Sequence, residues 1–241
     1  MSYLLQLKNV KKNIRGKRII NDVSLDINTS EIIGLLGPNG AGKTTTFYTI
    51  LGLATLDSGK VFFQDNDISS LKPYQRSKLG ISYLPQEPSI FRNLTVKNNI
   101  LGIGELFYKS DDLEEFYTKT IKEFGLTKVE NSLGSVLSGG QRRKVEIARA
   151  LASKPKLILL DEPFAGIDPI AIEDIKNILT SLSKKGISIL ITDHNIRETI
   201  TLCKRSIIIN NGEILAEGSA NELIHNEKVK VHYFGEMFDK P

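Results

Sequence analysis

The sequence predicts an α/β fold built on a mostly parallel sheet, and three observations support this prediction. Short apolar runs alternate with amphipathic helical patterns, as they do where helices cover both faces of a parallel sheet. A glycine-rich loop connects one apolar run to a helical pattern, which is the local order of a phosphate-binding loop. The chain has 241 residues, 40% of them hydrophobic and 25% charged, so it can bury a sizeable core.

The first part of the chain carries strand patterns around one helix. Weak alternation and a mixture of β-branched and polar residues favour an antiparallel, half-exposed sheet. A purely apolar run that stops at Gly37 and Pro38 is typical of a buried strand that feeds a turn. The predicted elements are strands over 4–10, 18–27 and 31–36, a helix over 43–53 and a strand over 59–64.

From about residue 86 to residue 150 the pattern becomes helical. Apolar residues between Leu113 and Phe124 recur at helical spacing, with charged residues between them. Strand patterns return after Pro155 and again alternate with helical ones. The predicted elements are a strand over 157–160, a helix over 170–184, a strand over 187–192 and a helix over 196–203.

We therefore expect one domain over residues 1–241. Its α/β core, which includes an antiparallel β part, would comprise about residues 1–86 and 151–241. A helical lobe would be inserted over about 87–150. A tail follows over about 225–241, and its aromatic residues predict packing against another part of the protein: Tyr233, Phe234 and Phe238.

The composition argues against several classes of protein. The formal net charge of +4 is small for a nucleic-acid-binding protein, and runs such as Arg142-Arg143-Lys144 are expected to be solvated. The single cysteine, Cys203, excludes an intramolecular disulfide framework and is expected in the core. No apolar run approaches the roughly 18–20 residues of a membrane span, and we expect no signal peptide. We expect no nucleic-acid partner, while an acidic partner such as anionic lipid headgroups stays open.

The strongest motif is a phosphate loop at residues 37–44, GPNGAGKT, which matches G-x-x-x-x-G-K-[ST] between a strand and a helix. Its glycines let successive backbone N–H groups face inward, where they and the helix N-terminus bind phosphate oxygens. Lys43 would reach the β- and γ-phosphates, and the Thr44 hydroxyl would bind Mg²⁺. The expected phosphate-binding residues are Gly37, Pro38, Asn39, Gly40, Ala41, Gly42, Lys43, Thr44 and Thr45.

Two carboxylates follow the apolar run at residues 157–160. The carboxyl end of a strand in a parallel sheet is an edge where ligands bind. Asp161 is therefore a candidate magnesium ligand, and Glu162 is the candidate base that orients and polarises an attacking water. The alternative is that both residues, which precede Pro163, simply cap a helix.

A second candidate anion site lies at residues 137–141, LSGGQ, where a serine and two glycines begin a helical pattern. Its expected nucleotide-binding residues are Ser138, Gly139, Gly140 and Gln141. One nucleotide can use both phosphate-binding elements only if two chains pair.

Together, the phosphate loop, LSGGQ and LILLDEP resemble the ATP-binding subunits of ATP-binding-cassette (ABC) transporters. The resemblance covers nearly the whole chain and implies a P-loop NTPase core of the ABC-cassette type. It also implies hydrolysis of ATP to ADP and phosphate with Mg²⁺. A second copy of the chain would form a head-to-tail dimer that holds two ATP molecules in its interface.

The resemblance implies roles for further residues. Gln86 would contact magnesium and sense the transmembrane partner, and His194 would touch the γ-phosphate. Ser138 and Gly140 would touch the γ-phosphate held by the opposite copy, and Asp168 would pass between the copies. The expected catalytic residues are Glu162, His194, Lys43 and Gln86, and the expected magnesium ligands are Thr44, Gln86 and Asp161.

One position departs from the pattern of the family. ABC cassettes usually carry an aromatic residue near the end of the first strand that stacks on adenine, and here Ile14 occupies that place. Isoleucine offers apolar contact without a π-face, whereas the neighbouring Arg15 would stack its guanidinium. We expect triphosphate binding without strong adenine selectivity.

Longer stretches, among them LDEPFAGIDPIAIEDIK and ITDHNIRET, closely resemble the ATPases of lipopolysaccharide export transporters. This implies a peripheral subunit on the cytoplasmic face of the inner membrane, beneath two integral membrane subunits. It would power lipopolysaccharide extraction without touching the lipid. The helical lobe and the Gln86 region would form the groove for the membrane partners, with Phe91 as a candidate groove residue.

Two alternatives remain open at this point. ATPases of branched-chain amino-acid importers have a similar tail and length, and the soluble ATPase of iron–sulfur cluster assembly shares the core motifs. A stoichiometric integral membrane partner would distinguish a transporter subunit from the soluble ATPase. DNA-repair and translation cassettes are disfavoured, because they usually carry two cassettes or large insertions.

Overall fold

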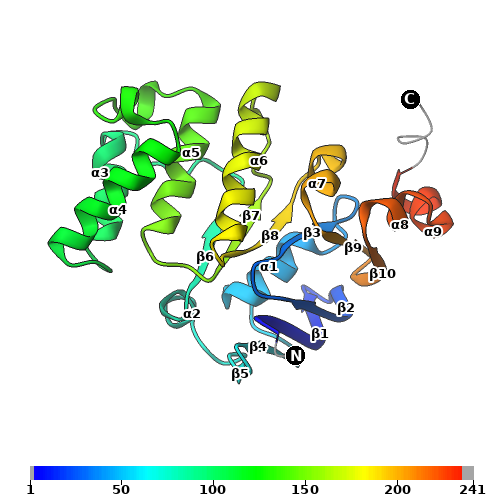
Figure 1. Cartoon of the computed structure of the whole chain (residues 1–241). Coiled ribbons are helices and arrows are strands. Elements are labelled where there is room, and N and C mark those ends of the chain that lie inside the picture. Colours follow the sequence, from blue (N-terminus) through cyan, green and yellow to red (C-terminus); the bar gives the residue numbers. More distant parts are fainter. Residues whose placement is uncertain (1–2, 235–241) are drawn as a thin grey trace.

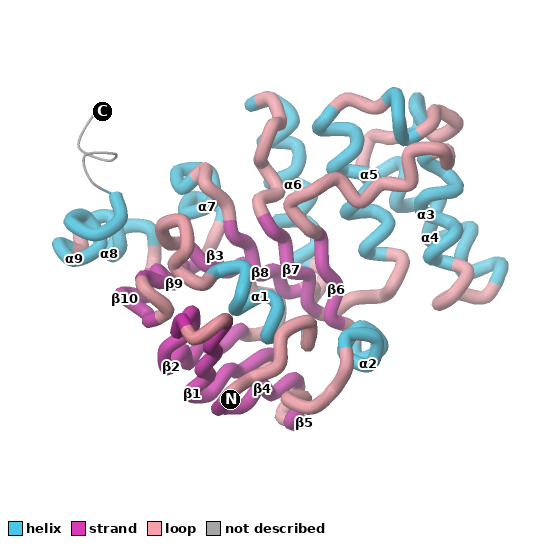
Figure 2. The backbone as a smooth tube through the Cα atoms, turned by 180° about the vertical axis from the view of Figure 1, so that it is seen from behind, coloured by secondary structure: helices cyan, strands magenta, loops and turns pink. Residues whose placement is uncertain are grey.

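In a computed structural model that describes residues 3–234, the chain forms two sheets flanked by helices. The six-stranded sheet has the order β10-β9-β3-β8-β7-β6, and within it only β10 runs antiparallel to its neighbour (Figure 2). The four-stranded sheet is antiparallel, with the order β2-β1-β4-β5. The strands are β1 (Leu5–Ile14), β2 (Lys17–Ile27), β3 (Ile32–Leu36), β4 (Ser58–Phe63), β5 (Asn66–Asp67), β6 (Ile81–Leu84), β7 (Leu157–Asp161), β8 (Ser188–Thr192), β9 (Arg205–Asn210) and β10 (Glu213–Gly218).

Most of the helices lie toward the two ends of the larger sheet, whereas α1 lies near its middle (Figure 1). Helices α3, α4 and α5 lie together at one end with α6 beside them, and α7, α8 and α9 lie toward the other end. Within residues 3–234, none of them has the length and apolar character that crossing a bilayer requires. The helices are α1 (Lys43–Leu51), α2 (Pro73–Leu79), α3 (Val96–Gly104), α4 (Ser110–Glu123), η1 (Thr127–Val129), η2 (Gly134–Val136), α5 (Gly139–Leu151), α6 (Pro169–Lys184), α7 (Ile196–Leu202), α8 (Ala220–Ile224), α9 (Glu227–Val229) and η3 (Lys230–Phe234).

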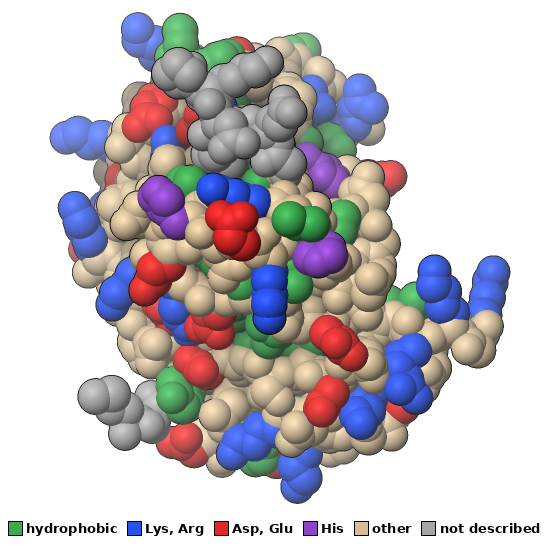
Figure 3. Space-filling view, turned by 90° about the vertical axis from the view of Figure 1, so that its right-hand side faces the viewer, with side chains coloured by type: hydrophobic (Ala, Val, Ile, Leu, Met, Phe, Trp, Pro, Cys, Tyr) green, Lys and Arg blue, Asp and Glu red, His purple; other side chains and the backbone are tan. Residues whose placement is uncertain are grey.

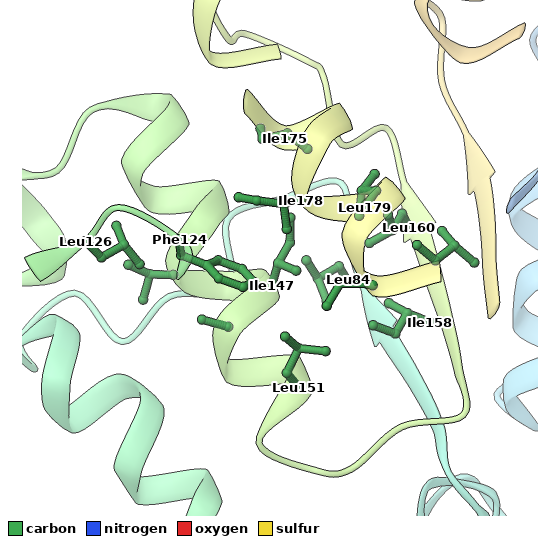
Figure 4. Packing of buried hydrophobic residues seen from close by; sticks show 14 of the residues in the cluster. Leu84, Phe124, Leu126, Ile147, Leu151, Ile158, Leu160, Ile175, Ile178 and Leu179 are labelled. Carbon is green, nitrogen blue, oxygen red and sulfur yellow. The ribbon is translucent and has the colours of Figure 1, made fainter. Parts of the chain in front are cut away.

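The central strands of the larger sheet are buried on both faces. In β7, Ile158 and Leu160 belong to one hydrophobic cluster, whereas Leu157 and Leu159 belong to another. The first cluster packs the sheet against α5 and α6, where Ile147 lies among the residues of Figure 4. The second cluster packs the opposite face against α1 and the antiparallel sheet. Because helices and strands cover both faces, polar groups of these strands reach open surface mainly at the strand ends.

The predicted strands and helices are present, with small shifts at their ends. The helix expected over 43–53 ends at Leu51, because Gly52 takes a left-handed φ of 74° and closes its last turn. The sequence analysis did not identify β6, β9, β10, α2, α3, α8 or α9, most of which are too short to carry a clear period. The division into a core and an inserted lobe stays a prediction.

A third hydrophobic cluster joins the C-terminal helices to α7 and to the end of β3. Phe234 is 3% exposed, and Tyr233 packs against this cluster, which confirms the packing expected for both residues. Phe238 lies outside the described residues. Cys203 is buried in the core as expected. The face seen in Figure 3 carries exposed histidine and charged side chains.

One buried cation ties α1 to the loop before α2. Arg76 is 2% exposed, and its guanidinium donates hydrogen bonds of 2.6 to 3.0 Å to the carbonyls of Thr49, Ile50, Ser69 and Leu71. Burial lowers the pKa of Arg76 to about 10, so the group still carries its charge at neutral pH. A cation at this place also matches the negative end of the α1 dipole.

Arg76→Met is expected to lower the free energy of unfolding by about 3 kcal/mol, because buried carbonyls lose their donor. Denaturant unfolding followed by circular dichroism would measure the change. Lys78→Met, at an exposed position of the same helix, is the control and should change stability by less than about 0.5 kcal/mol. Equal losses in the two variants would contradict the role assigned to the Arg76 guanidinium.

Candidate nucleotide-binding site

A cavity of about 320 Å³ opens at the carboxyl edge of the larger sheet. Parallel strands β3, β7 and β8 end at this edge, and each is followed by a loop that carries predicted site residues. The cavity is lined by Ile14, Lys17, Ile19, Asn39, Gly40, Ala41, Gly42, Lys43, Thr44, Thr45, Glu162 and His194. The structure therefore brings most of the predicted phosphate loop together with Glu162 and His194.

The phosphate loop has a backbone that only glycine fits at two positions. A side-chain Cβ on Gly37 would lie 2.0 Å from the carbonyl oxygen of Ile209, and Gly37 has a φ of 153°. Gly42 takes a φ of 108° and precedes α1 without a side-chain cap, so no side chain caps the first N–H groups of the helix. Unsatisfied N–H groups at a helix N-terminus favour a phosphate group.

Lys43 lies at the centre of this loop and is 8% exposed. Its Nζ donates to the carbonyl oxygens of Gly37 at 2.6 Å and Pro38 at 3.0 Å. Burial lowers the pKa of Lys43, while the nearby carboxylates of Glu162 and Asp161 oppose that shift. The ammonium is thus held inside the loop, within the electrostatic reach of both carboxylates.

Glu162 is held from two sides. Its Oε2 accepts a 2.7 Å hydrogen bond from the Gln86 side-chain amide, and its Oε1 lies 2.7 Å from Nε2 of His194. Its backbone takes a left-handed φ of 47°, which is uncommon for a residue with a long side chain. Strained backbone of this kind persists where the surroundings over-determine it, and it clusters at functional sites. The arrangement aims one carboxylate into the cavity in a fixed direction.

Asp161, at the end of β7, is 5% exposed and accepts a 3.2 Å hydrogen bond from the Tyr83 hydroxyl. Burial raises the pKa of the Asp161 carboxyl, and the Tyr83 hydrogen bond opposes the shift. The helix-cap alternative for this pair is wrong, because the next helix, α6, takes Asp168 as its N-cap. Asp161 and Glu162 instead stand at the strand end beside the phosphate loop.

The residues expected to hold Mg²⁺ carry the type of ligand atom that this ion prefers. Among residues 3–234, no group of three His, Cys, Asp or Glu side chains is arranged to bind a metal. Thr44, Gln86 and Asp161 would offer one hydroxyl, one amide oxygen and one carboxylate. Mg²⁺ prefers such oxygen ligands and is commonly held by one or two carboxylates together with phosphates of the substrate. The site therefore suits Mg²⁺ that arrives with a nucleotide.

The LSGGQ residues do not line this cavity. Ser138 is the N-cap of α5 and forms a capping box with Gln141, with hydrogen bonds of 3.2 and 3.1 Å. A Cβ on Gly140 would lie 2.5 Å from the Cβ of Ala171, so close packing of α5 on α6 requires glycine there. Gly139 lines a separate cleft of about 100 Å³ that it shares with Gln86 and Glu162. The predicted role of these residues toward a second copy, and that of Asp168, stay predictions.

Ile14 lines the cavity and is 43% exposed, and its expected place beside adenine stays a prediction. Arg15 lies in the turn after β1 with a φ of 51°, and the lining of the cavity does not include it. Lys17 and Ile19 of β2 line the cavity instead, and the sequence analysis missed them. These two residues reach the cavity because β2 pairs with β1, and no short sequence motif predicts that pairing.

The expectation that Arg142-Arg143-Lys144 is a solvated run was wrong for Arg143, which is 5% exposed. Its guanidinium donates to the carbonyl oxygens of Pro85 and Asp161 and to Oε2 of Glu146, each at 3.1 Å. The sequence signal was the Glu146 carboxylate three residues later on the same helix. Arg143 thereby connects α5 with the end of β7 and with the loop that contains Gln86.

Comparison with known proteins agrees with the phosphate-binding geometry of the cavity. A family model described as "ABC transporter" matches residues 20–165. The chain is 48% identical to "Lipopolysaccharide export system ATP-binding protein LptB" of Haemophilus influenzae, over 98% of each chain. The protein of the same name from Escherichia coli K12 is also 48% identical, over 97% of this chain and 98% of the relative.

Among solved structures, the ADP conformation of MJ1267, "an ATP-binding cassette of an ABC transporter", is similar over 98% of this chain and 100% of that chain. The TM-score is 0.88, and the sequences are 32% identical. The family resemblance inferred from the motifs is thereby confirmed, and so is the P-loop α/β cassette fold. The chain belongs to the ABC transporter family, as one of its ATP-binding subunits.

Proposed function

We propose that this chain hydrolyses ATP to power the export of lipopolysaccharide from the inner membrane. As an ABC-type ATPase it binds ATP with Mg²⁺ and converts ATP and water to ADP and phosphate. The observation that carries the proposal is Glu162, which two hydrogen-bonding partners hold at the phosphate-loop cavity. The names and 48% identity of the relatives support lipopolysaccharide as the cargo.

Several residues in and beside the cavity have roles in the proposed reaction. The N–H groups at the start of α1 and the Lys43 ammonium bind the phosphates and stabilise charge on the transferred phosphoryl group. Glu162 orients the attacking water in line and accepts its proton. His194 holds the γ-phosphate, and Gln86 keeps the Glu162 carboxylate in place through the 2.7 Å hydrogen bond. Thr44, Gln86 and Asp161 would hold Mg²⁺, which would supply positive charge beside the phosphates.

The active form is a head-to-tail dimer of this chain with two ATP molecules in its interface. Ser138 and Gln141 cap α5 at an exposed helix start, outside the cavity of their own chain. A helix N-terminus is an anion-binding element. In the dimer, this helix start therefore completes the phosphate site of the opposite copy, and Asp168 lies at the same interface.

Two integral inner-membrane subunits dock in a groove between the helical lobe and the Gln86 loop. A cavity of about 310 Å³ opens beside the helical lobe, and its lining includes Ser89, Arg149 and Leu106, which is 75% exposed. Phe91 is 51% exposed, and the Arg149 guanidinium lies 4.8 Å from its ring centroid. Arg149 also donates to the carbonyl oxygen and the hydroxyl of Ser89, at 2.7 and 2.6 Å. Apolar side chains on this rigid support suit a helix end of a membrane partner.

The groove and the catalytic carboxylates share one buried connection. Glu146, which is 2% exposed, accepts the N–H groups of Ser89 and Ile90 at 2.6 and 3.1 Å. The Glu146 carboxylate also accepts a hydrogen bond from the Arg143 guanidinium, which donates a further one to the carbonyl oxygen of Asp161. A displacement of the groove by the partner therefore reaches the end of β7, because a buried ion pair tolerates little separation.

The proposal is tested by purifying the tagged chain from membranes in mild detergent and identifying what accompanies it. Two integral membrane proteins and lipopolysaccharide-dependent ATP hydrolysis are the expected result. If amino-acid permeases accompanied the chain instead, the proposed cargo would be wrong and the proposed ATPase activity would stand. Soluble iron–sulfur assembly proteins without a membrane partner would overturn the transport proposal.

Glu162→Gln is expected to reduce ATP turnover by about 10²- to 10⁴-fold, because the amide cannot accept the proton of the attacking water. ATP binding should persist, since the phosphate loop is unchanged, and the dimer should accumulate in its closed form. Phosphate release, nucleotide titration and size-exclusion chromatography measure the three effects. Glu173→Gln on α6, outside the cavity, is the control. Near-normal turnover in Glu162→Gln would refute the assignment of the base.

Phe91→Ala is expected to weaken assembly with the membrane subunits by about tenfold or more, as removal of a buried aromatic anchor does at interfaces. ATP hydrolysis by the isolated chain should change by less than about twofold, because Phe91 lies outside the phosphate-loop cavity. Co-purification with the partners and ATPase assays measure the two effects. Leu53→Ala, at another exposed apolar position, is the control. Normal assembly of the Phe91→Ala variant with the membrane subunits would contradict the assignment of Phe91 to the docking groove.

A further inference from the structure

The loops after β7 and β8 carry the two side chains that meet at the edge of the cavity, Glu162 and His194. Oε1 of Glu162 lies 2.7 Å from Nε2 of His194. The two strands pair as far as Asp161 and Thr192, and beyond that pair the sheet no longer sets the distance between the two chain segments. Contacts outside the sheet therefore hold the loops together at the place where the reaction occurs.

Asp193 makes such a contact, and each of its carboxylate oxygens binds a different loop. The residue directly precedes His194 and is 3% exposed. Its Oδ2 accepts the backbone N–H of Phe164, in the loop after β7, at 2.8 Å. Its Oδ1 accepts the backbone N–H of Asn195, in its own loop, at 2.7 Å. Hydrogen bonds from backbone N–H groups to a carboxylate are charge-assisted and about twice as strong as bonds between neutral groups.

The bond to Asn195 sets the backbone around His194. An aspartate oxygen that accepts the N–H two residues further along the chain closes an Asx turn, and His194 is the residue inside this turn. The turn leads directly into α7, because the carbonyl oxygen of His194 accepts the N–H of Ile196 at 3.0 Å and Asn195 is the N-cap of the helix. The backbone of His194 is thus fixed before its imidazole reaches Glu162.

The bond to Phe164 fixes the backbone around Glu162. On one side, the Glu162 N–H donates to the carbonyl oxygen of Thr192 at 2.7 Å. On the other side, Pro163, whose ring fixes its φ, leads to Phe164, whose side chain is 3% exposed in the core. Asp193 holds the N–H of this phenylalanine. The left-handed backbone of Glu162 is sustained because the segments on both sides of it are bound to the loop after β8.

We propose that Asp193 is a positioning residue for ATP hydrolysis, because its carboxylate holds the loops of Glu162 and His194 in the relative position that the reaction needs. Asp193 does not line the cavity, so it acts through those two residues. The inference rests on the ATP hydrolysis proposed above and is independent of the cargo.

Asp193→Asn tests the inference in the full-length chain, because the amide keeps the size of the side chain and replaces one acceptor oxygen by a donor. One of the two loop contacts is then lost. We expect kcat for ATP to fall by about ten- to hundredfold, since small misplacements at a catalytic site cost this much. KM for ATP should change by less than about twofold, because the phosphate loop is unchanged. A merely structural role would lower the melting temperature and leave the kcat of the folded protein unchanged.

A combined variant shows whether Asp193 acts through the loop of His194. Residues that act as a unit have effects on kcat that are not additive in free energy. Asp193→Asn together with His194→Ala should therefore lose less activity than the product of the two single losses. Single-turnover hydrolysis of ATP by the four proteins measures this difference.

Glu31→Gln is the matched control, because Glu31 is another buried carboxylate that accepts a backbone N–H. It is 4% exposed, accepts the N–H of Asn28 at 2.8 Å and lies outside the nucleotide cavity. This variant should lose stability and keep its kcat. Asp193→Ser, whose hydroxyl can still accept the Asn195 N–H in a turn, replaces Asp193→Asn if the latter does not fold, and it should show the same selective loss of kcat.

Four results would overturn the inference: a normal kcat in Asp193→Asn, an equal loss of kcat in Glu31→Gln, single losses that multiply in the combined variant, or failure of both Asp193 variants to fold. An unmodified chain that hydrolysed no ATP would instead overturn the proposed ATPase, and the same assay separates this result from the other four.

Discussion

The nucleotide site depends first on the burial of β3, β7 and β8 on both faces. Their side chains alternate between two hydrophobic clusters, so a slip of one residue would move every side chain into the other cluster, whose packing it does not match. In this register Asp161 lies opposite Thr192, and Gly34 lies opposite Ile191. Consequently, the loops that follow these strands leave the sheet side by side. The phosphate loop, Glu162 and His194 meet there although more than a hundred residues separate the first two in the sequence.

Partial burial then makes the charges of the site depend on one another. Lys43 and Asp161 are 8% and 5% exposed, and burial alone disfavours the charged form of each. Their mutual attraction opposes that penalty, so neither group is independent of the other. Glu162 takes a left-handed backbone conformation between Gln86 and His194. This strain is sustained because hydrogen bonds and packing around Glu162 leave it no alternative position.

The site is connected to both ends of the molecule by buried contacts, which are polar on the side of the helical lobe and apolar on the other side. On the side of the helical lobe, Arg143 and Glu146 join the loop at Pro85, Ser89 and Ile90 to the end of β7. On the opposite side, the C-terminal helices pack against Leu36, which directly precedes the phosphate loop. A buried charge that loses its partner costs free energy, so the loop at Pro85, Ser89 and Ile90 is expected to move together with the end of β7. Such coupling is what a transporter subunit needs in order to convert nucleotide chemistry into motion of a partner.

By itself, the sequence determined the phosphate loop, the carboxylates after β7 and the α/β fold, because each depends on local order: apolar runs, glycines and a helix start. It also placed Ile14 at the cavity, since the family pattern counts along one strand. It misjudged Arg143, because a basic run looks the same in the sequence whether its helix face is solvated or buried. Only the tertiary structure decided that Gln86 and His194 hold Glu162, that LSGGQ lies away from the cavity of its own chain, and that the C-terminal helices pack against Leu36. The reason is physical: these contacts join segments distant in the chain, and strand register and helix packing set their distances, which no local pattern encodes.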